Sequence, residues 1–179
     1  MSIKRTSSIV VFFFFIISVS FSQEEERLRN LVKISTDTAQ IKAYIDLGNY
    51  YYNTTHNGDS LIKFSNKALK LSKDIKNTRK EMKSYMSLAI GYNANAINNE
   101  QAEDYNSVFL NLEKGLELAK KLDDKKRQAE FYNNFGIIYL NYGDRALAME
   151  NRLNAARISE SISDFTNAAL SYSGVSLIF

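Results

Sequence analysis

The sequence predicts an all-α protein built as an array of antiparallel helix pairs. The chain of 179 residues has no proline and only seven glycines, so it lacks the turn residues that punctuate an all-β protein. After residue 36, apolar side chains recur at spacings of three and four, which is the period of one helix face. Small residues also recur inside these apolar stripes, about 40 to 47 positions apart, a period typical of stacked helical repeats.

Residues 1–22 have the three parts of a signal peptide. Lys4 and Arg5 are followed by an apolar run over 9–21, and Ser20 and Ser22 precede a possible cleavage site before Gln23. The alternative is a retained membrane anchor, but the run is shorter than the roughly 20 apolar residues that span a bilayer. We therefore expect export to the periplasm or the cell surface.

The helices follow in order. A charged lead-in helix is expected within 23–36, and Thr36 or Asp37 is expected to cap the next helix. Breaks are predicted at 56–60, with Asp59 or Ser60 as a cap, and then at 76–77, 98–99, 123–124 and 143–144. A last helix is predicted to begin near Asp164. The apolar stripes between these breaks contain Tyr44, Leu47 and Tyr51; Leu61, Phe64, Ala68, Leu71 and Ile75; Tyr85, Leu88 and Tyr92; Tyr105, Phe109, Leu112, Leu116 and Ala119; Tyr132, Phe135, Tyr139 and Tyr142; and Leu147, Ala148, Ala155 and Ile158.

Two kinds of helix alternate along the chain. A helices place a small residue between two aromatic residues, at positions 48, 89 and 136, and B helices carry a small residue at positions 68, 115 and 155. Helix axes pack 8–10 Å apart, and a large side chain at the crossing would hold them further apart. Because a glycine inside a helix costs about 1 kcal/mol relative to alanine, Gly48, Gly115 and Gly136 are expected at such crossings.

This pattern resembles the tetratricopeptide repeat family, most clearly over residues 129–158. The matching positions there are Tyr132, Phe135, Gly136, Tyr139, Gly143, Asp144, Ala148 and Ala155. Residues 37–75 resemble the longer repeat variety of exported Bacteroidetes-type proteins, and residues 82–122 match more loosely. Arg145 and Arg152 stand where the family usually has aromatic residues, and the proline that often ends a repeat is missing.

The resemblance implies a right-handed superhelical array over 37–179, a TPR-like α-solenoid with about three repeats and the first helix of a fourth. Residues 167–179 begin that fourth repeat and end in an apolar segment, which is a poor cap for such an array. We therefore expect the natural chain to continue beyond Phe179.

The composition argues against catalysis and against nucleic-acid binding. The chain has no cysteine, its single histidine, His56, lies in an expected turn, and its glycines form no phosphate-binding loop. We therefore expect no enzyme activity, no cofactor and no metal site. The net charge is +3, and removal of Lys4 and Arg5 leaves 21 basic and 20 acidic residues, with no basic face for nucleic acid.

The family resemblance also implies a peptide-binding groove along the A helices. The groove positions carried over to this sequence are Ile45, Asn49, Tyr52, Asn53, Lys83, Met86, Ile90, Asn93, Asn133, Ile137, Leu140 and Asn141. Because an asparagine amide both donates and accepts hydrogen bonds, and only Lys83 is cationic, this set favours a neutral extended peptide over an acidic tail. The expected function is thus an exported, non-catalytic scaffold that binds a protein or an extended peptide.

A second function fits the same sequence. Such repeats can form the extracytoplasmic sensor region of a membrane signalling protein, a histidine kinase or a helix-turn-helix regulator, whose transmembrane and output parts would follow this chain. The gene sequence beyond Phe179 distinguishes the two, because a further stretch of about 20 apolar residues would favour the sensor.

Overall fold

The computed structural model describes residues 23–56, 58–99 and 102–178, and these described residues form helices and short turns without a strand. The predicted signal peptide at 1–22 lies outside them. Residues 23–34 are helical and correspond to the lead-in helix. Seven further helices follow: α2 (Asp37–Thr55), α3 (Gly58–Asp74), α4 (Thr78–Asn99), α5 (Ala102–Lys121), α6 (Lys125–Asn141), α7 (Arg145–Ser161) and α8 (Phe165–Ser176).

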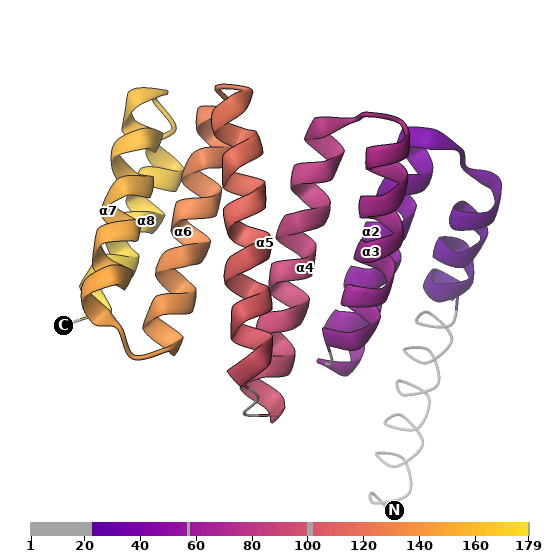
Figure 1. Ribbon diagram of the computed structural model, residues 1–179, viewed down its shortest axis with the longest axis horizontal. Coiled ribbons are helices and arrows are strands. Elements are labelled where there is room, and N and C mark those ends of the chain that lie inside the picture. Colours follow the sequence, from indigo (N-terminus) through magenta and orange to yellow (C-terminus); the bar gives the residue numbers. More distant parts are fainter. Residues whose placement is uncertain (1–22, 57, 100–101, 179) are drawn as a thin grey trace, which may run out of the picture.

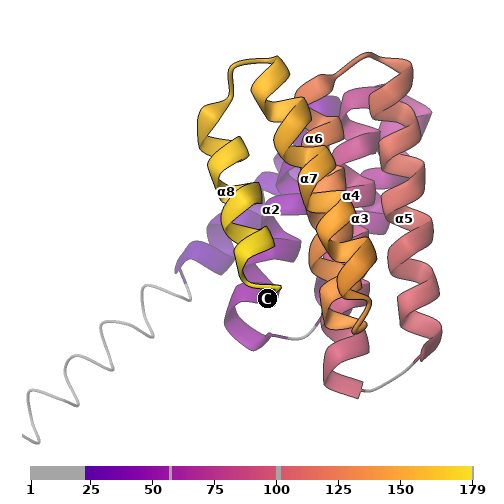
Figure 2. The ribbon, with the colours of Figure 1, turned by 90° about the vertical axis from the view of Figure 1, so that its left-hand side faces the viewer.

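Each helix packs against the next one along the chain, from α2 to α8. Figure 1 shows the helices side by side in sequence order, from α2 and α3 at one end of the molecule to α7 and α8 at the other. Turned by 90°, α2 and α8 lie on one side of the molecule and α3 and α5 on the other (Figure 2). The predicted all-α array of helix pairs is therefore confirmed, with α2, α4, α6 and α8 as the A helices and α3, α5 and α7 as the B helices.

Four turns between helices share one geometry. In each, a residue with positive φ precedes an aspartate or asparagine whose side-chain oxygen accepts a hydrogen bond from the backbone N–H three residues later. The four pairs are Lys76 with Asn77, Asp123 with Asp124, Gly143 with Asp144, and Ser163 with Asp164. The breaks predicted at 76–77, 123–124 and 143–144, and the last helix near Asp164, are thus confirmed.

The boundaries of α3 and α4 differ from the prediction. Helix α3 begins at Gly58, before the expected caps Asp59 and Ser60. Its first N–H is satisfied from a distant part of the chain, because Asn95 Oδ1 in α4 accepts a hydrogen bond of 2.9 Å from the Gly58 amide. The Asn95 Nδ2 also donates to Asp59 over 2.7 Å. Helix α4 continues through Asn99 instead of turning at 98–99.

At the start of α2, Thr36 occupies the predicted N-cap position. Its side chain makes no capping hydrogen bond, and Asp37, the first residue of the helix, has a positive φ of 51°. This helix start therefore differs from the four turns with a capping side chain.

The predicted close helix crossings are confirmed at Gly48 and Gly136. A Cβ added at Gly48 would lie 3.2 Å from Leu61 in α3, and one at Gly136 would lie 3.1 Å from the Ala148 carbonyl oxygen in α7. At Gly115 the space is taken by the ring of Phe131 in α6, whose Cζ would be 2.2 Å from an added Cβ. Each glycine thus admits a neighbouring helix or side chain that alanine would displace.

Among the described residues, buried apolar side chains form a smaller and a larger cluster. Ile41, Ile45 and Ala68 form the smaller cluster between α2 and α3. The larger cluster joins α4, α5 and α6 and consists of Met82, Ala89, Val108, Leu112, Leu116, Ala119, Phe131, Phe135 and Ile138. Between the clusters α3 and α4 approach closely at Gly58 and Gly91, where a Cβ on Gly58 would lie 2.0 Å from the Gly91 carbonyl oxygen.

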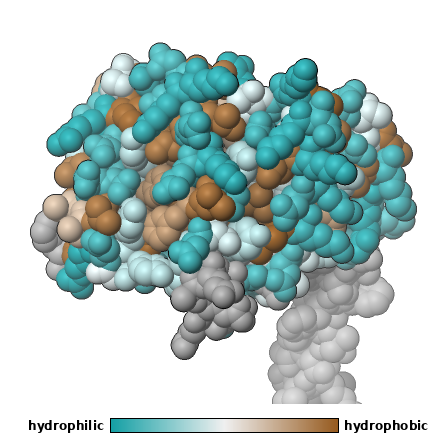
Figure 3. All heavy atoms as spheres, viewed as in Figure 1, coloured by the Kyte–Doolittle hydropathy of each residue, from teal (hydrophilic) through white to brown (hydrophobic). Residues whose placement is uncertain are grey.

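The outer face of the array is mainly hydrophilic. Helices α3, α5 and α7 face the viewer in Figure 1, and in the same orientation apolar side chains are interspersed among hydrophilic ones (Figure 3). Within the described part of the chain, no helix combines the length and the apolar character needed to cross a membrane.

Candidate functional site

The predicted groove residues on the A helices are mostly accessible. Ile90 in α4 and Ile137 in α6 expose 36% and 37% of their surface. Asn53, Lys83 and Asn141 are exposed, and Asn49, Tyr52, Asn93, Asn133 and Leu140 are half-buried. Eleven of the twelve positions, Met86 included, therefore retain some contact with solvent.

Two predicted groove residues belong wholly or partly to the core. Ile45 has no exposed surface and packs in the cluster with Ile41 and Ala68, so its assignment to the groove is wrong. The reason is its spacing of four from Ile41, which places both side chains on the face of α2 that meets α3. Met86 is half-buried and packs against the larger cluster of α4, α5 and α6.

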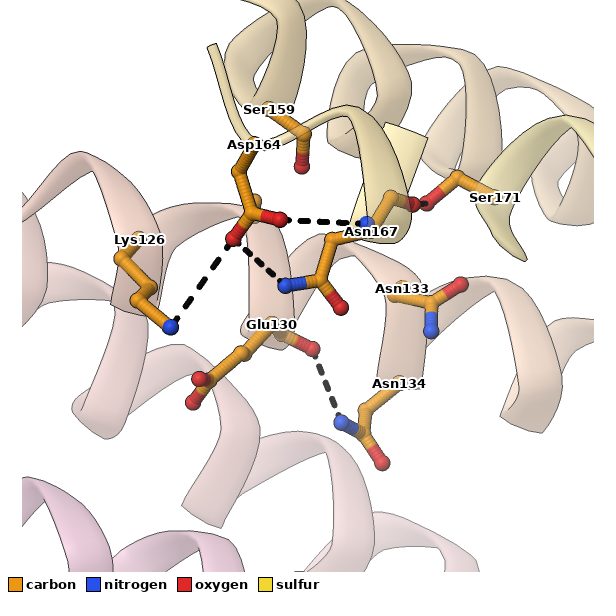
Figure 4. A pocket seen from close by; sticks show the side chains of 9 residues that line it. Lys126, Glu130, Asn133, Asn134, Ser159, Asp164, Asn167 and Ser171 are labelled. Carbon is orange, nitrogen blue, oxygen red and sulfur yellow. Dashed lines mark hydrogen bonds and ion pairs between the residues drawn. The ribbon is translucent and has the colours of Figure 1, made fainter. Parts of the chain in front are cut away.

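A polar pocket of about 80 Å³ lies between α6 and α8 and is bordered by the end of α7. Its lining residues are Lys126, Ala129, Glu130, Asn133, Asn134, Ser159, Asp164, Asn167 and Ser171. Figure 4 shows that polar groups from α6 and α8 face one another across this space. Asn133 is the predicted groove residue that lies in this pocket.

Asp164 organises one side of the pocket. Its carboxylate accepts hydrogen bonds from the Asn167 amide nitrogens, over 3.2 Å from the backbone and 2.7 Å from Nδ2, and Lys126 Nζ lies 3.8 Å away (Figure 4). The pKa of Asp164 is lowered mainly by the hydrogen bond from the Asn167 side chain. The hydrogen bond from the Asn167 backbone and the Lys126 charge lower this pKa further. The carboxylate therefore remains an acceptor at neutral pH and holds Asn167 in place.

Arg152 lies behind the opposite side of the pocket. Its side chain passes between two glycines. A Cβ added to Gly136 would lie 2.6 Å from Arg152 Cγ, and a Cβ added to Gly174 would lie 1.8 Å from Arg152 Nη1. Nη1 donates a hydrogen bond of 3.2 Å to Asn133 Oδ1, whereas Nε is buried without a partner. Burial lowers the pKa of the Arg152 guanidinium, because no carboxylate offsets the lost hydration.

Ser159 contributes a buried hydroxyl. The residue is only 1% exposed, its Oγ has no hydrogen-bond partner, and its side chain lines the pocket (Figure 4). A buried polar atom without a partner is uncommon in folded proteins and requires an explanation.

Sequence reasoning missed most of this pocket. Ser159, Asn167 and Ser171 are polar residues on helices, and in the sequence they are indistinguishable from residues on a solvated face. Asp164 was predicted only as the start of the last helix. The one signal was Arg152, which replaces an aromatic residue of the resembled repeat and therefore marks an unusual environment.

The described residues contain no group of three or more His, Cys, Asp or Glu side chains placed to hold a metal ion. The fold and the pocket together define a helical-repeat-like array with a polar cavity on its A helices.

Comparison with known proteins supports the fold alone. No family model matches the chain, and no curated protein matches it. Among the solved structures that match, the crystal structure of BtubC (BKLC) from P. vanneervenii shares 18% sequence identity and a TM-score of 0.54. The similarity covers 92% of this chain and 72% of that chain. At this level of identity, the two proteins share an architecture.

Proposed function

We propose that this chain is an exported tetratricopeptide-repeat scaffold that binds an extended peptide segment of a partner protein along its A helices and catalyses no reaction. The main observation behind the proposal is that α4 and α6 each expose an isoleucine. Ile90 and Ile137 expose more than a third of their surface on these A helices, whereas the aliphatic residues of the core are almost fully buried. Ile90 follows Ala89 and Ile137 follows Gly136, so the two isoleucines hold the same position on successive A helices, where one extended segment would cover both.

The polar groups of the same positions support a peptide as the ligand. Asn93 has a buried side-chain oxygen without a hydrogen-bond partner, and Asn133 lines the pocket between α6 and α8. A peptide backbone offers one donor and one acceptor per residue, and asparagine amides can match both. Alternating apolar and amide positions therefore suit an extended segment that places side chains against Ile90 and Ile137 and its backbone beside the asparagines.

Export and the repeat family rest on the sequence. The signal peptide over 1–22 and the repeat pattern over 129–158 support them, and the array of helix pairs has the architecture that the repeat pattern implies. The near-neutral charge favours a protein or peptide partner over nucleic acid.

The test is peptide selection with the purified protein. A random-peptide display library is panned against the immobilised protein, and the affinity of enriched peptides is measured by fluorescence anisotropy. We expect Ile137→Ala to weaken binding about fivefold, because the bound peptide would bury roughly a third of an isoleucine side chain, worth about 1 kcal/mol.

Leu110→Ala is the matched control. Leu110 is also an exposed aliphatic residue, at 50%, but it lies on α5, a B helix. The proposal is refuted if no peptide is enriched, or if the two alanine variants weaken binding equally.

A further inference from the structure

The pocket between α6 and α8 has hydrogen-bonding groups that the protein itself does not use. Two of its asparagines have one half of the amide engaged by a charged neighbour, and the orientation of each amide is therefore fixed. Arg152 can only donate, so the atom of Asn133 that faces it is the oxygen, at 3.2 Å. The Asp164 carboxylate can only accept, so the atom of Asn167 that faces it is the nitrogen, at 2.7 Å.

The remaining halves of the two amides have opposite character. Asn133 keeps its NH₂ group as a donor, and Asn167 keeps its side-chain oxygen as an acceptor. Both residues line the pocket, one on α6 and the other on α8 (Figure 4). The pocket therefore presents a donor on one wall and an acceptor on the other.

Ser159 adds a third group. Its hydroxyl can donate and accept, it is buried from solvent and it has no partner within the protein. Because a buried hydroxyl without a partner costs free energy, a ligand that bonds to it would recover that cost on binding. This hydroxyl distinguishes the pocket from a merely polar depression at the start of α8.

We propose that this pocket binds the primary amide side chain of a glutamine or asparagine in the bound segment. A primary amide carries a carbonyl oxygen for the Asn133 NH₂ group and an NH₂ group for the Asn167 oxygen. The Ser159 hydroxyl bonds to whichever end of the amide lies nearest. The pocket volume of about 80 Å³ is several times what one water molecule needs, and therefore admits a small side-chain group. The assignment of this amide to a peptide rests on the proposed function above.

Charged side chains fit the same walls less well. A carboxylate has no donor for the Asn167 oxygen and would lie near Asp164. An ammonium or guanidinium group would be attracted by the Glu130 and Asp164 carboxylates, but it has no acceptor for the Asn133 NH₂ group and would lie near Lys126. Compared with these charged groups, the neutral amide offers both an acceptor for the Asn133 NH₂ group and a donor for the Asn167 oxygen.

The experiment uses capped single amino acids as probes. The ¹⁵N-labelled full chain is titrated with N-acetyl-L-glutamine methylamide, with the corresponding glutamate and with the corresponding methionine, and followed by NMR. We expect the glutamine probe alone to shift the backbone signals of Ser159, Asn167 and Ser171 in a saturable manner. Equal shifts with the glutamate or methionine probe, or no shift with the glutamine probe up to its solubility limit, would overturn the inference.

Two variants separate recognition from folding. Ser159→Ala removes a hydroxyl that bonds to nothing in the protein. It should therefore lower the affinity for the glutamine probe about two- to tenfold without lowering the melting temperature of the protein. Ser173→Ala, an exposed position on α8, is the control and should leave the affinity for the probe unchanged, with the same small propensity gain in melting temperature. A lower melting temperature with unchanged probe affinity for Ser159→Ala would assign the hydroxyl a purely structural role and refute the proposal.

Asn133→Asp gives the sharper contrast. The aspartate still offers an oxygen to Arg152 but has no NH₂ group, so binding of the glutamine probe should be lost. The melting temperature should rise at the same time, because the buried guanidinium gains a counter-charge. Retained glutamine binding in this variant would contradict the assigned donor.

The outcomes also separate this inference from the proposed function. If display selection enriches no peptide while the glutamine probe still binds specifically, the peptide scaffold is refuted and the amide pocket stands. If peptides bind through Ile137 but show no dependence on an amide residue or on Ser159, the scaffold stands and the amide pocket is refuted.

Discussion

Gly58→Ala should strongly destabilise the array, because Gly58 is the glycine that comes closest to the backbone of another helix. The added Cβ would lie 2.0 Å from the Gly91 carbonyl oxygen, whereas an ordinary contact begins at 3.4 Å, so α3 and α4 would have to separate by about 1.4 Å. The hydrogen bond of 2.9 Å between the Gly58 amide and Asn95 Oδ1 would be strained by the same movement.

The magnitude follows from three contributions. Overpacking against backbone costs about 1–3 kcal/mol, and the loss of the Asn95 hydrogen bond costs about 1 kcal/mol. The higher helix propensity of alanine stabilises the fold by less than about 1 kcal/mol at this position, in the first turn of a helix. We expect a net loss of about 2–3 kcal/mol in the free energy of unfolding.

The assay is urea denaturation followed by far-UV circular dichroism, with Gly48→Ala as the matched control. Gly48 is also a helical glycine at a crossing, but its added Cβ would lie 3.2 Å from Leu61 Cδ1, 3.3 Å from Phe64 Cβ and 3.4 Å from Leu61 Cα, so its neighbours would have to move by only a few tenths of an ångström. This control should change the free energy of unfolding by no more than about 1 kcal/mol. Equal effects of the two substitutions would refute the argument from backbone contact.

Two other substitutions test the packing around α7 and α8. Arg152→Met should raise the free energy of unfolding by about 1–2 kcal/mol in the same denaturation assay. The reason is that it replaces a buried cation without a carboxylate partner by an apolar side chain of similar length. A lower free energy of unfolding would mean that the guanidinium is stabilising. Ser163→Gly should raise stability by about 0.5 kcal/mol, because φ at this position is 57° and glycine tolerates it better. Ser173→Gly, within α8, should lower stability by about 0.5–1 kcal/mol, and two changes of the same sign would contradict this account.

The fold was predictable because its main determinants are local. The spacing of apolar residues, the break at Gly143 and Asp144, and the small residues at Gly48 and Gly136 can all be read within one helix and the turn beside it. These features depend on helix period and turn chemistry, which the sequence specifies over a few residues.

The parts that could not be predicted depend on how two distant helices are placed. Gly58 packs against Gly91, and Asn95 accepts a hydrogen bond from the first residue of α3, which lies 37 residues earlier. No local sequence pattern indicates either contact. Ile45 was assigned to the groove by its repeat position, but the rotation of α2 turns it towards α3. The pocket was missed for the same reason, since Asn133 and Asn167 come to line one pocket only when α8 folds back on α6.

In the four repeated turns, the bonds that reverse the chain and start the next helix are all local. A left-handed residue reverses the chain, and the following aspartate or asparagine starts the next helix through a bond to a residue three positions away. A duplicated gene segment would therefore already encode the residues that form its turns. The array can then gain or lose whole helix pairs without further substitutions at these turns. The junction before α3 is different, because the Gly58 amide depends on Asn95 in α4, and these two helices must be inherited together.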